Sequence, residues 1–265
     1  DAYDYFYSGD DLYTNSDPTE ILNTLKTATT EDFPTPPEVS FSIKYVDKSL
    51  EDSVSPAFYM TPPIDDVTNN VIYINNSEEN GNSDLFSTLA HEGYPGHMYQ
   101  ITSFYASNPN PVRCLYSFLG YCEGWATYAE VKAYDYADYV KYPEDIATIS
   151  KASDILSLTL SSRIDIGVNY EGWKLTDVED YLTQSGYDAS YGADIYQYVI
   201  ENPSVYLRYC IGYLEIAQLE TNAKTALGDA FNQKEFNAVL INAGPCQFNL
   251  VNTYVNDYID SKKNQ

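Results

Sequence analysis

The residues best suited to catalysis lie in the stretch Ser87 to Gln100, STLAHEGYPGHMYQ. His91 and His97 are the two histidines of the chain, and Glu92 directly follows the first of them. In the zinc-peptidase pattern H-E-x-x-H, histidines four residues apart share a helix face and bind one ion, and the glutamate is the general base. The residue types therefore indicate a hydrolytic zinc site, but the second histidine comes two residues late.

The spacing of the two histidines requires a break in the helix. On an unbroken helix His91 and His97 would be about 240° apart in rotation and about 9 Å apart along the axis, too far for one ion. Pro95 has no N–H for the carbonyl of His91 and its ring clashes there, while Gly96 relaxes the backbone. We expect a break or bulge between Glu92 and His97. The alternative is two unrelated histidines at a helix end.

A catalytic zinc ion needs a third protein ligand besides two histidines. Both tryptophans of the chain lie in the tripeptide Glu-Gly-Trp, which makes Glu123 and Glu171 the two candidates. We favour Glu123, because it lies in a strongly helical, apolar segment where an unpaired carboxylate would be costly. Glu171 lies near an expected helix end. A solvated helix carboxylate is the alternative role for Glu123.

The motifs AHEGYPGH and EGWATYAE together resemble a bacterial family catalogued as domain of unknown function 885, which is grouped with the gluzincin metallopeptidases. The resemblance extends from PAFYM and VIYIN through SRIDIGVNYEGW and YLRYCIGYLEIAQL to LINAGP. Members of that family are usually much longer. The resemblance therefore implies that this chain is the C-terminal, catalytic half and that an N-terminal half of the same protein is missing.

The resemblance also implies the roles of the site residues. His91, His97 and Glu123 would bind Zn²⁺. Glu92 would be the general base that takes a proton from water and passes it to the leaving amine of a peptide substrate.

Substrate contacts are implied less directly. The strand that carries Tyr73 and Asn75 would lie along the cleft as an edge strand and hold the substrate backbone by β-addition. Asn169 stands where the family tends to have histidine, and it can still donate a hydrogen bond to an oxyanion. Helix-surface or packing roles are the alternative for the remaining candidates. These remaining candidates for substrate or transition-state contacts are Arg163, Arg208 and Tyr209.

The elements that must position these residues form an α+β fold that is predominantly α-helical. Three short apolar runs in residues 39–75, FSIKYVD, PAFYM and NVIYIN, predict a small sheet of about three strands before the histidine helix. NSEENGNSD predicts a loop, with Ser83 or Asp84 as the N-cap of the next helix. We expect helices over 85–97, 111–139, 143–170, 175–186, 204–228 and 232–244, and one more in the tail.

We expect two regions along the chain. Residues 1–37 form an acidic arm or a remnant of the missing N-terminal half, and residues 38–265 form a gluzincin-like catalytic domain. The formal net charge of −25 argues against nucleic acid as a partner, and no apolar run is long enough for a membrane span.

The sequence also bears on the location of the protein. The opening DAYDYFYSGDDLY is no signal peptide, so the protein is cytoplasmic or the sequence is a mature or trimmed form. The tyrosine-rich, lysine-poor composition favours an extracellular or cell-surface bacterial protein. Disulfides between Cys114 and Cys122 and between Cys210 and Cys246 would support export, whereas four free thiols, the alternative, would weaken this prediction.

Two functions are consistent with these residues. The first is a zinc-dependent peptide hydrolase. The alternative is a catalytically weak or inactive gluzincin-like scaffold, which presents its tyrosine-rich surface to a peptide or a glycan.

Overall fold

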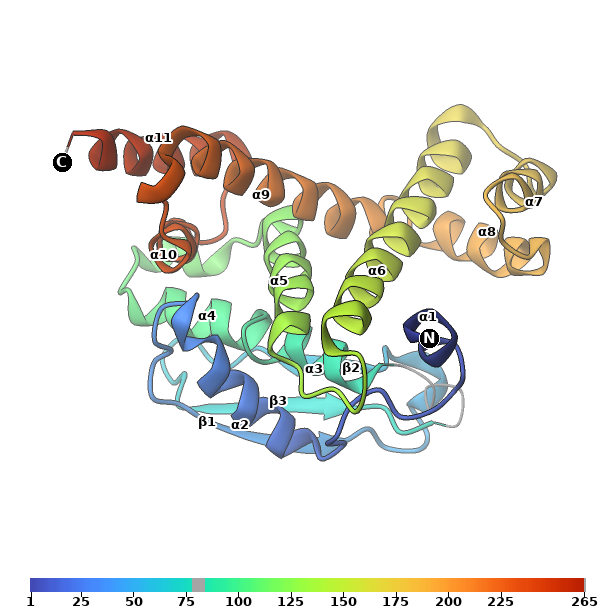
Figure 1. Cartoon of the computed structure of the whole chain (residues 1–265), viewed down its shortest axis with the longest axis horizontal. Coiled ribbons are helices and arrows are strands. Elements are labelled where there is room, and N and C mark those ends of the chain that lie inside the picture. The colour runs from blue at the N-terminus through green and yellow to red at the C-terminus, as the bar shows by residue number, and fades with distance from the viewer. Residues whose placement is uncertain (78–83, 265) are drawn as a thin grey trace.

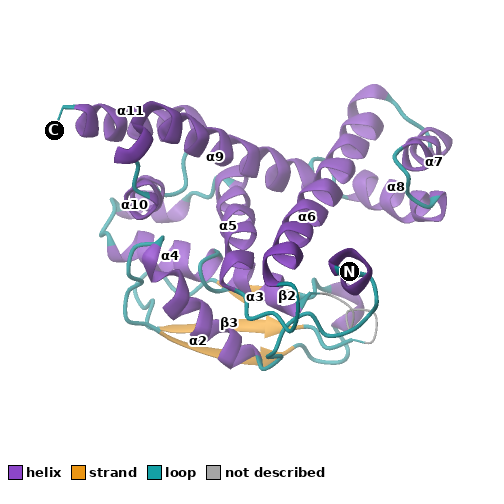
Figure 2. Cartoon of the chain, viewed as in Figure 1, coloured by secondary structure: helices purple, strands orange, loops and turns teal. Residues whose placement is uncertain are grey.

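The computed structural model describes residues 1–77 and 84–264. Helices account for most of these residues and a small sheet lies along one side of them, which confirms the predicted α+β class (Figures 1 and 2). Most of the loop expected over NSEENGNSD, including the cap candidate Ser83, lies outside the described residues. Asp84 does cap the next helix, because its Oδ1 accepts a hydrogen bond from the Ser87 N–H at 3.1 Å.

The sheet contains the three expected strands, β1 (Ser40–Tyr45), β2 (Ala57–Met60) and β3 (Asn69–Ile74). The strand order is β1-β3-β2, with β1 parallel and β2 antiparallel to β3. The middle strand is therefore β3, and the expectation that it is an edge strand is wrong.

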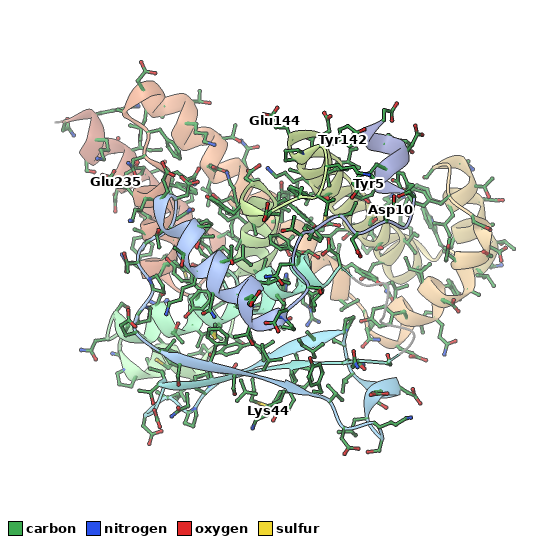
Figure 3. The ribbon with its side chains drawn as sticks, turned by 60° about the horizontal axis from the view of Figure 1, so that its bottom comes forward. Tyr5, Asp10, Lys44, Tyr142, Glu144 and Glu235 are labelled. Atoms are coloured by element: carbon green, nitrogen blue, oxygen red, sulfur yellow. The ribbon has the colours of Figure 1, made fainter. Side chains whose placement is uncertain are left out.

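Alternation of side chains gives the sheet one buried and one open face. Ile72 and Ile74 of β3 are buried against the helices and belong to the main hydrophobic core. Lys44 of β1 points away from the helices, on the open face (Figure 3). The buried face of the sheet therefore packs against the helices that carry the histidines.

The central helices α5 (Leu119–Ala133) and α9 (Val205–Leu227) cross at a pair of glycines. A Cβ atom placed on Gly124 would lie 2.4 Å from the backbone of Gly212, so both positions must be glycine for the helices to approach this closely. The Gly in EGWATYAE is thus explained by packing, and the crossing holds the segments that carry Glu123 and Tyr209 side by side.

The chain between α5 and α9 forms a helical arm, which begins in the main core at Ala147 and whose far end extends away from the sheet (Figure 1). It consists of α6 (Pro143–Ile166), a π-helical turn (Gly167–Glu171), α7 (Leu175–Gln184) and α8 (Gly192–Glu201). This arm has a small core of its own, formed by Leu160, Ile164, Val178, Leu182 and Val199.

The first 37 residues, expected as an acidic arm or a remnant, pack against the rest of the protein. They contain α1 (Ala2–Phe6) and α2 (Pro18–Ala28), and Leu22, Leu25 and Phe33 are buried in the main core. The domain boundary expected at residue 38 stays a prediction, but these residues are part of the same packed body.

The last two helices of the chain follow the predicted positions closely. Residues 98–106 and 192–201 are also helical, although no helix was predicted there, and one predicted helix is divided. The segment 111–139, expected as one helix, is a short 3₁₀ turn, then an extended step at Tyr116, then α5 and another 3₁₀ turn. The other helices are α3 (Leu85–Glu92), α4 (His97–Ala106), α10 (Gln233–Ala243) and α11 (Phe248–Lys263). The 3₁₀ turns are Thr29–Glu31, Glu51–Ser53, Pro111–Leu115, Tyr134–Tyr136, Ala189–Tyr191 and Gly228–Ala230.

The structure also bears on the expected absence of a membrane span and on the two possible disulfides. In the part of the chain that the structure describes, no helix is long and apolar enough to cross a membrane. Cys114, Cys122, Cys210 and Cys246 are all free, so neither of the two disulfides is present.

Candidate metal centre

The helix breaks between Glu92 and His97, as predicted. Helix α3 ends at Glu92, α4 begins at His97, and the peptide bond between Tyr94 and Pro95 is cis. The Gly96 N–H donates to the carbonyl of Ala90 at 3.0 Å, and a Cβ atom on Gly96 would lie only 1.8 Å from the carbonyl oxygen of His91. Glycine is therefore required for this tight turn, which brings the two imidazole rings to within 4.8 Å of each other, centroid to centroid.

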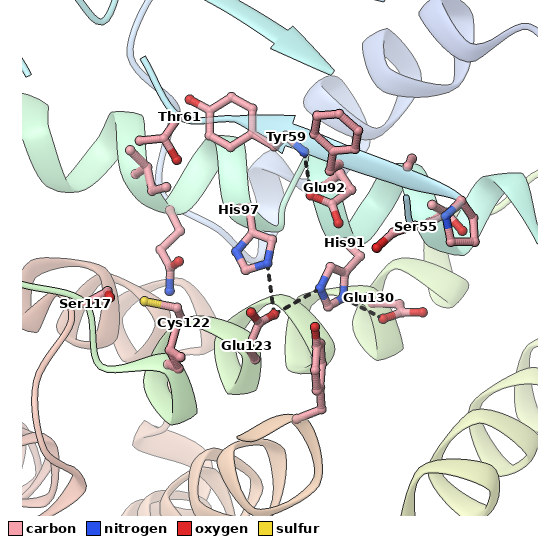
Figure 4. A pocket seen from close by; sticks show the side chains of 18 residues that line it. Ser55, Tyr59, Thr61, His91, Glu92, His97, Ser117, Cys122, Glu123 and Glu130 are labelled. Atoms are coloured by element: carbon pink, nitrogen blue, oxygen red, sulfur yellow. Dashed lines mark hydrogen bonds and ion pairs between the residues drawn. The ribbon is translucent and has the colours of Figure 1, made fainter. Parts of the chain in front are cut away.

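The two histidines converge on one carboxylate oxygen. Glu123 Oε2 lies 3.1 Å from Nε2 of His97 and 3.6 Å from Nε2 of His91 (Figure 4). One ligand atom from each of His91, Glu92 and His97 also falls within 4.8 Å of the others. The sequence prediction that His91, His97 and Glu123 lie together is thus met by the geometry.

This donor set suits a zinc ion. With zinc–ligand bonds of roughly 2.0–2.2 Å in a tetrahedron, neighbouring ligand atoms lie about 3.4 Å apart. The observed distances of 3.1 and 3.6 Å from Glu123 Oε2 to the two Nε2 atoms bracket that value. Two neutral imidazoles and one carboxylate also form the His₂Glu set found in catalytic zinc sites, which leaves a fourth position for water.

Glu130 is a site residue that the sequence interpretation missed. Its Oε2 lies 2.9 Å from Nδ1 of His91, on the side of the ring opposite Glu123 (Figure 4). A carboxylate in this position accepts the Nδ1–H and leaves Nε2 for a metal ion. The signal was present in the sequence, because Glu130 lies seven residues after Glu123 and two helix turns place both on one face of α5.

The electrostatics of the cluster favour a positive charge. Burial opposes the charged form of His91, but hydrogen bonds with Glu123 and Glu130 outweigh burial and raise the pKa of His91 to about 10. Burial likewise works to raise the pKa of Glu123, yet its hydrogen bonds with His91 and His97 lower it to about 2. The half-buried carboxylates thus stabilise a cation here, and a divalent metal supplies one without protonating a histidine.

Glu92 lies beside the cluster with one oxygen already held. Its Oε2 accepts a hydrogen bond from the backbone N–H of Tyr59 in β2 at 2.8 Å (Figure 4). Glu92 lines the same cavity of about 530 Å³ as His91, His97 and Glu123. One oxygen of Glu92 is therefore fixed by β2, while the side chain borders the same cavity as both histidines.

Tyr209 is the one predicted contact residue on α9 that lines this cavity. Its ring centroid lies 6.0 Å from that of His91. Burial, with the nearby charges of Glu123 and Glu92, raises the pKa of Tyr209 above its ordinary value, so the hydroxyl stays protonated and can donate. Arg208 is half-buried next to it and does not line the cavity.

Arg163 and Asn169 lie in the helical arm and do not line the cavity. Arg163 Nη2 donates to Glu171 at 2.8 Å, and its guanidinium lies over the ring of Trp173. Asn169 Nδ2 donates to Asp165 at 2.9 Å and to the Val199 carbonyl at 3.0 Å, tying the π-helical turn to α8. Both residues stabilise the arm in this structure. Glu171, the rival third ligand, is paired with Arg163 instead.

Tyr73 and Asn75 also have packing roles. Tyr73 stacks on Phe58 with ring centroids 5.2 Å apart. Asn75 is buried, and its Nδ2 donates to the carbonyls of Glu51 at 2.7 Å and Val54 at 3.0 Å. The strand that borders the cavity is β2 instead, because strand order depends on tertiary pairing that the local sequence pattern does not encode.

Comparisons with known proteins agree with this fold. The model of a family described as "Bacterial protein of unknown function (DUF885)" matches residues 10–253. A search of curated proteins found no match.

Two solved structures are similar to the chain. The "putative lipoprotein" from Colwellia psychrerythraea has a TM-score of 0.81 and 24% identity, over 98% of this chain and 47% of that chain. The "putative lipoprotein of unknown function" from Shewanella oneidensis has a TM-score of 0.65 and 15% identity, over 90% of this chain and 46% of that chain. These matches establish a shared fold, and the chain spans about half the length of each structure.

Proposed function

The chain belongs to the bacterial DUF885 family, and we propose that it is a gluzincin-like, zinc-dependent peptide hydrolase. In this proposal His91, His97 and Glu123 bind Zn²⁺ and Glu92 is the general base. The observation that carries the proposal is the convergence of both Nε2 atoms on Glu123 Oε2, beside Glu92, in one cavity. A bound Zn²⁺ supplies Lewis acidity towards a carbonyl and makes water more acidic.

Glu92 moves the proton in this mechanism. The Tyr59 N–H holds Oε2, which fixes the carboxylate plane and leaves Oε1 to accept a proton from the attacking water. Glu92 then gives that proton to the amine nitrogen as the peptide C–N bond breaks. The Tyr209 hydroxyl, which stays protonated, is placed to donate to the oxyanion that develops on the substrate carbonyl.

The outer edge of β2 is where an extended substrate would bind. The Pro56 carbonyl accepts from the Asn75 N–H at 2.8 Å, so Pro56 faces β3 and alternation directs the backbone groups of Ala57 and Tyr59 outward. The bond from Tyr59 N–H to Glu92 agrees with this orientation. The Tyr59 N–H is already bonded to Glu92, so a peptide added to this edge would pair with the outward backbone groups of Ala57 and lie next to Glu92.

A peptide digest tests the proposed function. Zinc-loaded wild-type protein should cleave members of a mixed peptide pool, and the Glu92→Gln variant should cleave them at least about 10²-fold more slowly, because it lacks the base. The exposed Glu215→Gln variant on α9 is the matched control and should match wild type. Equal cleavage by the Glu92→Gln variant would rule out the mechanism. If the wild type binds peptides without cleaving them, the alternative of an inactive peptide-binding scaffold is favoured.

We also propose an extracellular or cell-surface location. Two similar structures carry the description "putative lipoprotein", and the composition of this chain is acidic and poor in lysine. The chain spans about half of each of these relatives, and we propose that an N-terminal half of the whole protein completes the cleft. Fractionation of cells that express the whole protein tests the location, since recovery in the cytoplasm would contradict it.

A further inference from the structure

Gln100 is buried in the wall of the cavity of about 530 Å³ that His91, His97 and Glu123 line, which we call the metal cavity, and its amide is unpaired. Gln100 lies on α4, three residues after His97, and is 1% exposed. Among the residues that the structure describes, neither Nε2 nor Oε1 of Gln100 has a hydrogen-bond partner, although the side chain lines the cavity. Burying an unpaired amide is costly, and buried amides normally have a partner, so a water molecule or a ligand in the cavity is the natural partner for Gln100.

A second cavity of about 280 Å³ adjoins the metal cavity at the same residue. Gln100, Ile101 and Cys122 are among the residues that line both spaces. The walls of the second cavity that lie beyond them are mostly apolar or aromatic, and include Phe104, Tyr105, Leu115 and Tyr116.

Arg113, the positively charged residue that lines this second cavity, already has hydrogen-bond partners. Arg113 Nη2 donates to the carbonyls of Ala243 at 2.7 Å and Pro245 at 3.2 Å, and the guanidinium lies over the Phe104 ring. The arginine therefore braces the wall, and the space beside it suits a large apolar or aromatic group.

We propose that the second cavity is a substrate subsite and that Gln100 anchors the substrate main chain at its entrance; this inference rests on the proposed peptide hydrolysis. Successive residues of an extended peptide direct their N–H and C=O groups to opposite sides. Residues that pair with β2 therefore alternate with residues whose backbone groups face away from β2. The Gln100 amide, with one acceptor and two donors, matches the N–H and C=O of one such residue. A neighbouring large apolar or aromatic side chain enters the second cavity.

The Gln100→Met variant separates a substrate anchor from a structural residue. Methionine keeps the length of the side chain and removes the unsatisfied amide, so the thermal midpoint should stay equal to that of wild type or rise. Zinc content should not change, whereas kcat/KM on a cleaved peptide should fall about tenfold or more through two lost hydrogen bonds. Gln197→Met, an exposed position on α8, is the matched control and should leave both quantities unchanged.

Either of two results overturns the anchor. A lower thermal midpoint for Gln100→Met would show that the amide stabilises the fold, and an unchanged kcat/KM would show that it does not bind substrate. If wild type cleaves no peptide, the proposed hydrolysis fails by itself. In that case peptide retention by zinc-loaded Glu92→Gln protein, with and without Gln100→Met, decides the anchor, and equal retention overturns it.

Cleavage of a randomised peptide pool tests the subsite. Wild type should prefer a large apolar or aromatic residue at one position next to the cleaved bond. Cys114 lines only the second of the two cavities, so Cys114→Trp should shift that preference to small residues, while Cys114→Ala keeps it. An unchanged preference in Cys114→Trp, or a wild-type preference for charged residues at that position, would overturn the subsite.

Discussion

At the scale of single residues, Glu130 orients the imidazole ring of His91. Its carboxylate lies against Nδ1, and Glu123 lies on the Nε2 side, so the ring is held from both ends. Such an outer carboxylate fixes the tautomer and the orientation of a ligating histidine and increases its basicity. Glu130 is therefore as much a part of the proposed centre as the residues that contact the metal.

Replacement of Glu130 tests this role. We expect Glu130→Ala to weaken zinc binding about 10–100-fold with the fold retained, because His91 loses the group that orients it. Competition with a chromophoric chelator measures the affinity, and circular dichroism checks the fold. The control is Glu215→Ala, at an exposed position on α9. Wild-type affinity in Glu130→Ala would show that the carboxylate does not position His91.

The raised pKa of Asp154 predicts a pH dependence of the free energy of unfolding. Burial, together with the charge of Glu130, raises the pKa of Asp154 to about 7, although the hydrogen bond from the Tyr134 hydroxyl opposes the shift. The carboxyl of an unfolded chain titrates near pH ~4. The folded state thus holds the proton more tightly, and this residue reduces stability as the pH rises from about 4 to about 7.

The Asp154→Asn variant removes this titration and keeps an acceptor for Tyr134. It should be more stable than wild type by roughly 2–4 kcal/mol above pH 7, and the difference should vanish towards pH 4. Urea denaturation over this pH range measures both curves, with the exposed Asp257→Asn as control. A constant difference at all pH values would contradict the assigned cause.

At the scale of elements, the glycine crossing of α5 and α9 holds the proposed site together. Gly124 and Gly212 allow the two backbones to touch, which places Glu123 next to the segment that carries Tyr209. The indole N–H of Trp125 donates to the Pro95 carbonyl at 3.0 Å, so α5 also braces the break between the histidines. The tripeptide Glu-Gly-Trp therefore combines a proposed ligand, a packing contact and a brace.

Two glycines of the same helix make a matched pair for testing this crossing. Gly124→Ala should destabilise the protein by about 2 kcal/mol or more, because the new Cβ would lie 2.4 Å from the Gly212 backbone. Gly120→Ala meets only a ring carbon of Phe248 at 3.9 Å, so the free energy of unfolding should be unchanged or rise by up to about 1 kcal/mol. Chemical denaturation compares them, and equal effects would contradict the crossing.

The elements also show how far local sequence can predict this site. The break before His97 was predictable because Pro95 and Gly96 act on their own backbone. The finding that β2 and not β3 is the edge strand beside the cavity was not predictable, since strand order depends on pairing between distant segments. The positions of Arg163 and Asn169 relative to the cavity were not predictable either, because they depend on how the helical arm packs against distant segments. Gln100 has no sequence signal, because its missing partners are a property of packing.

At the scale of the whole molecule, the sequence predicted a helical body with a small sheet, and hydrophobic periodicity was sufficient for that. It did not predict that residues 1–37 contribute Leu22, Leu25 and Phe33 to the main core. Their acidic, proline-containing sequence resembles a linker, and only the packed structure shows that α2 lies over the sheet and α3 (Figure 1).

The net charge of −25 also acts on the whole molecule. Like charges at this density repel one another and destabilise the compact state, and added salt screens that repulsion. We therefore expect the thermal midpoint to rise as sodium chloride increases from about 10 mM to about 0.5 M at constant pH, over which the Debye length falls from ~30 Å to a few ångströms. Differential scanning calorimetry measures the midpoint. A midpoint that falls with salt would show that attractive ion pairs dominate.

Zinc titration of two glutamate variants tests most directly whether His91, His97 and Glu123 form one zinc site. Glu123 and Glu171 both precede Gly-Trp, so Glu171→Gln is the matched control for Glu123→Gln. The wild type and Glu171→Gln should each bind one tight zinc ion per chain, and Glu123→Gln should bind it at least about 10²-fold more weakly, since it loses a ligand. Tight binding in Glu123→Gln, or none in the wild type, would contradict the account.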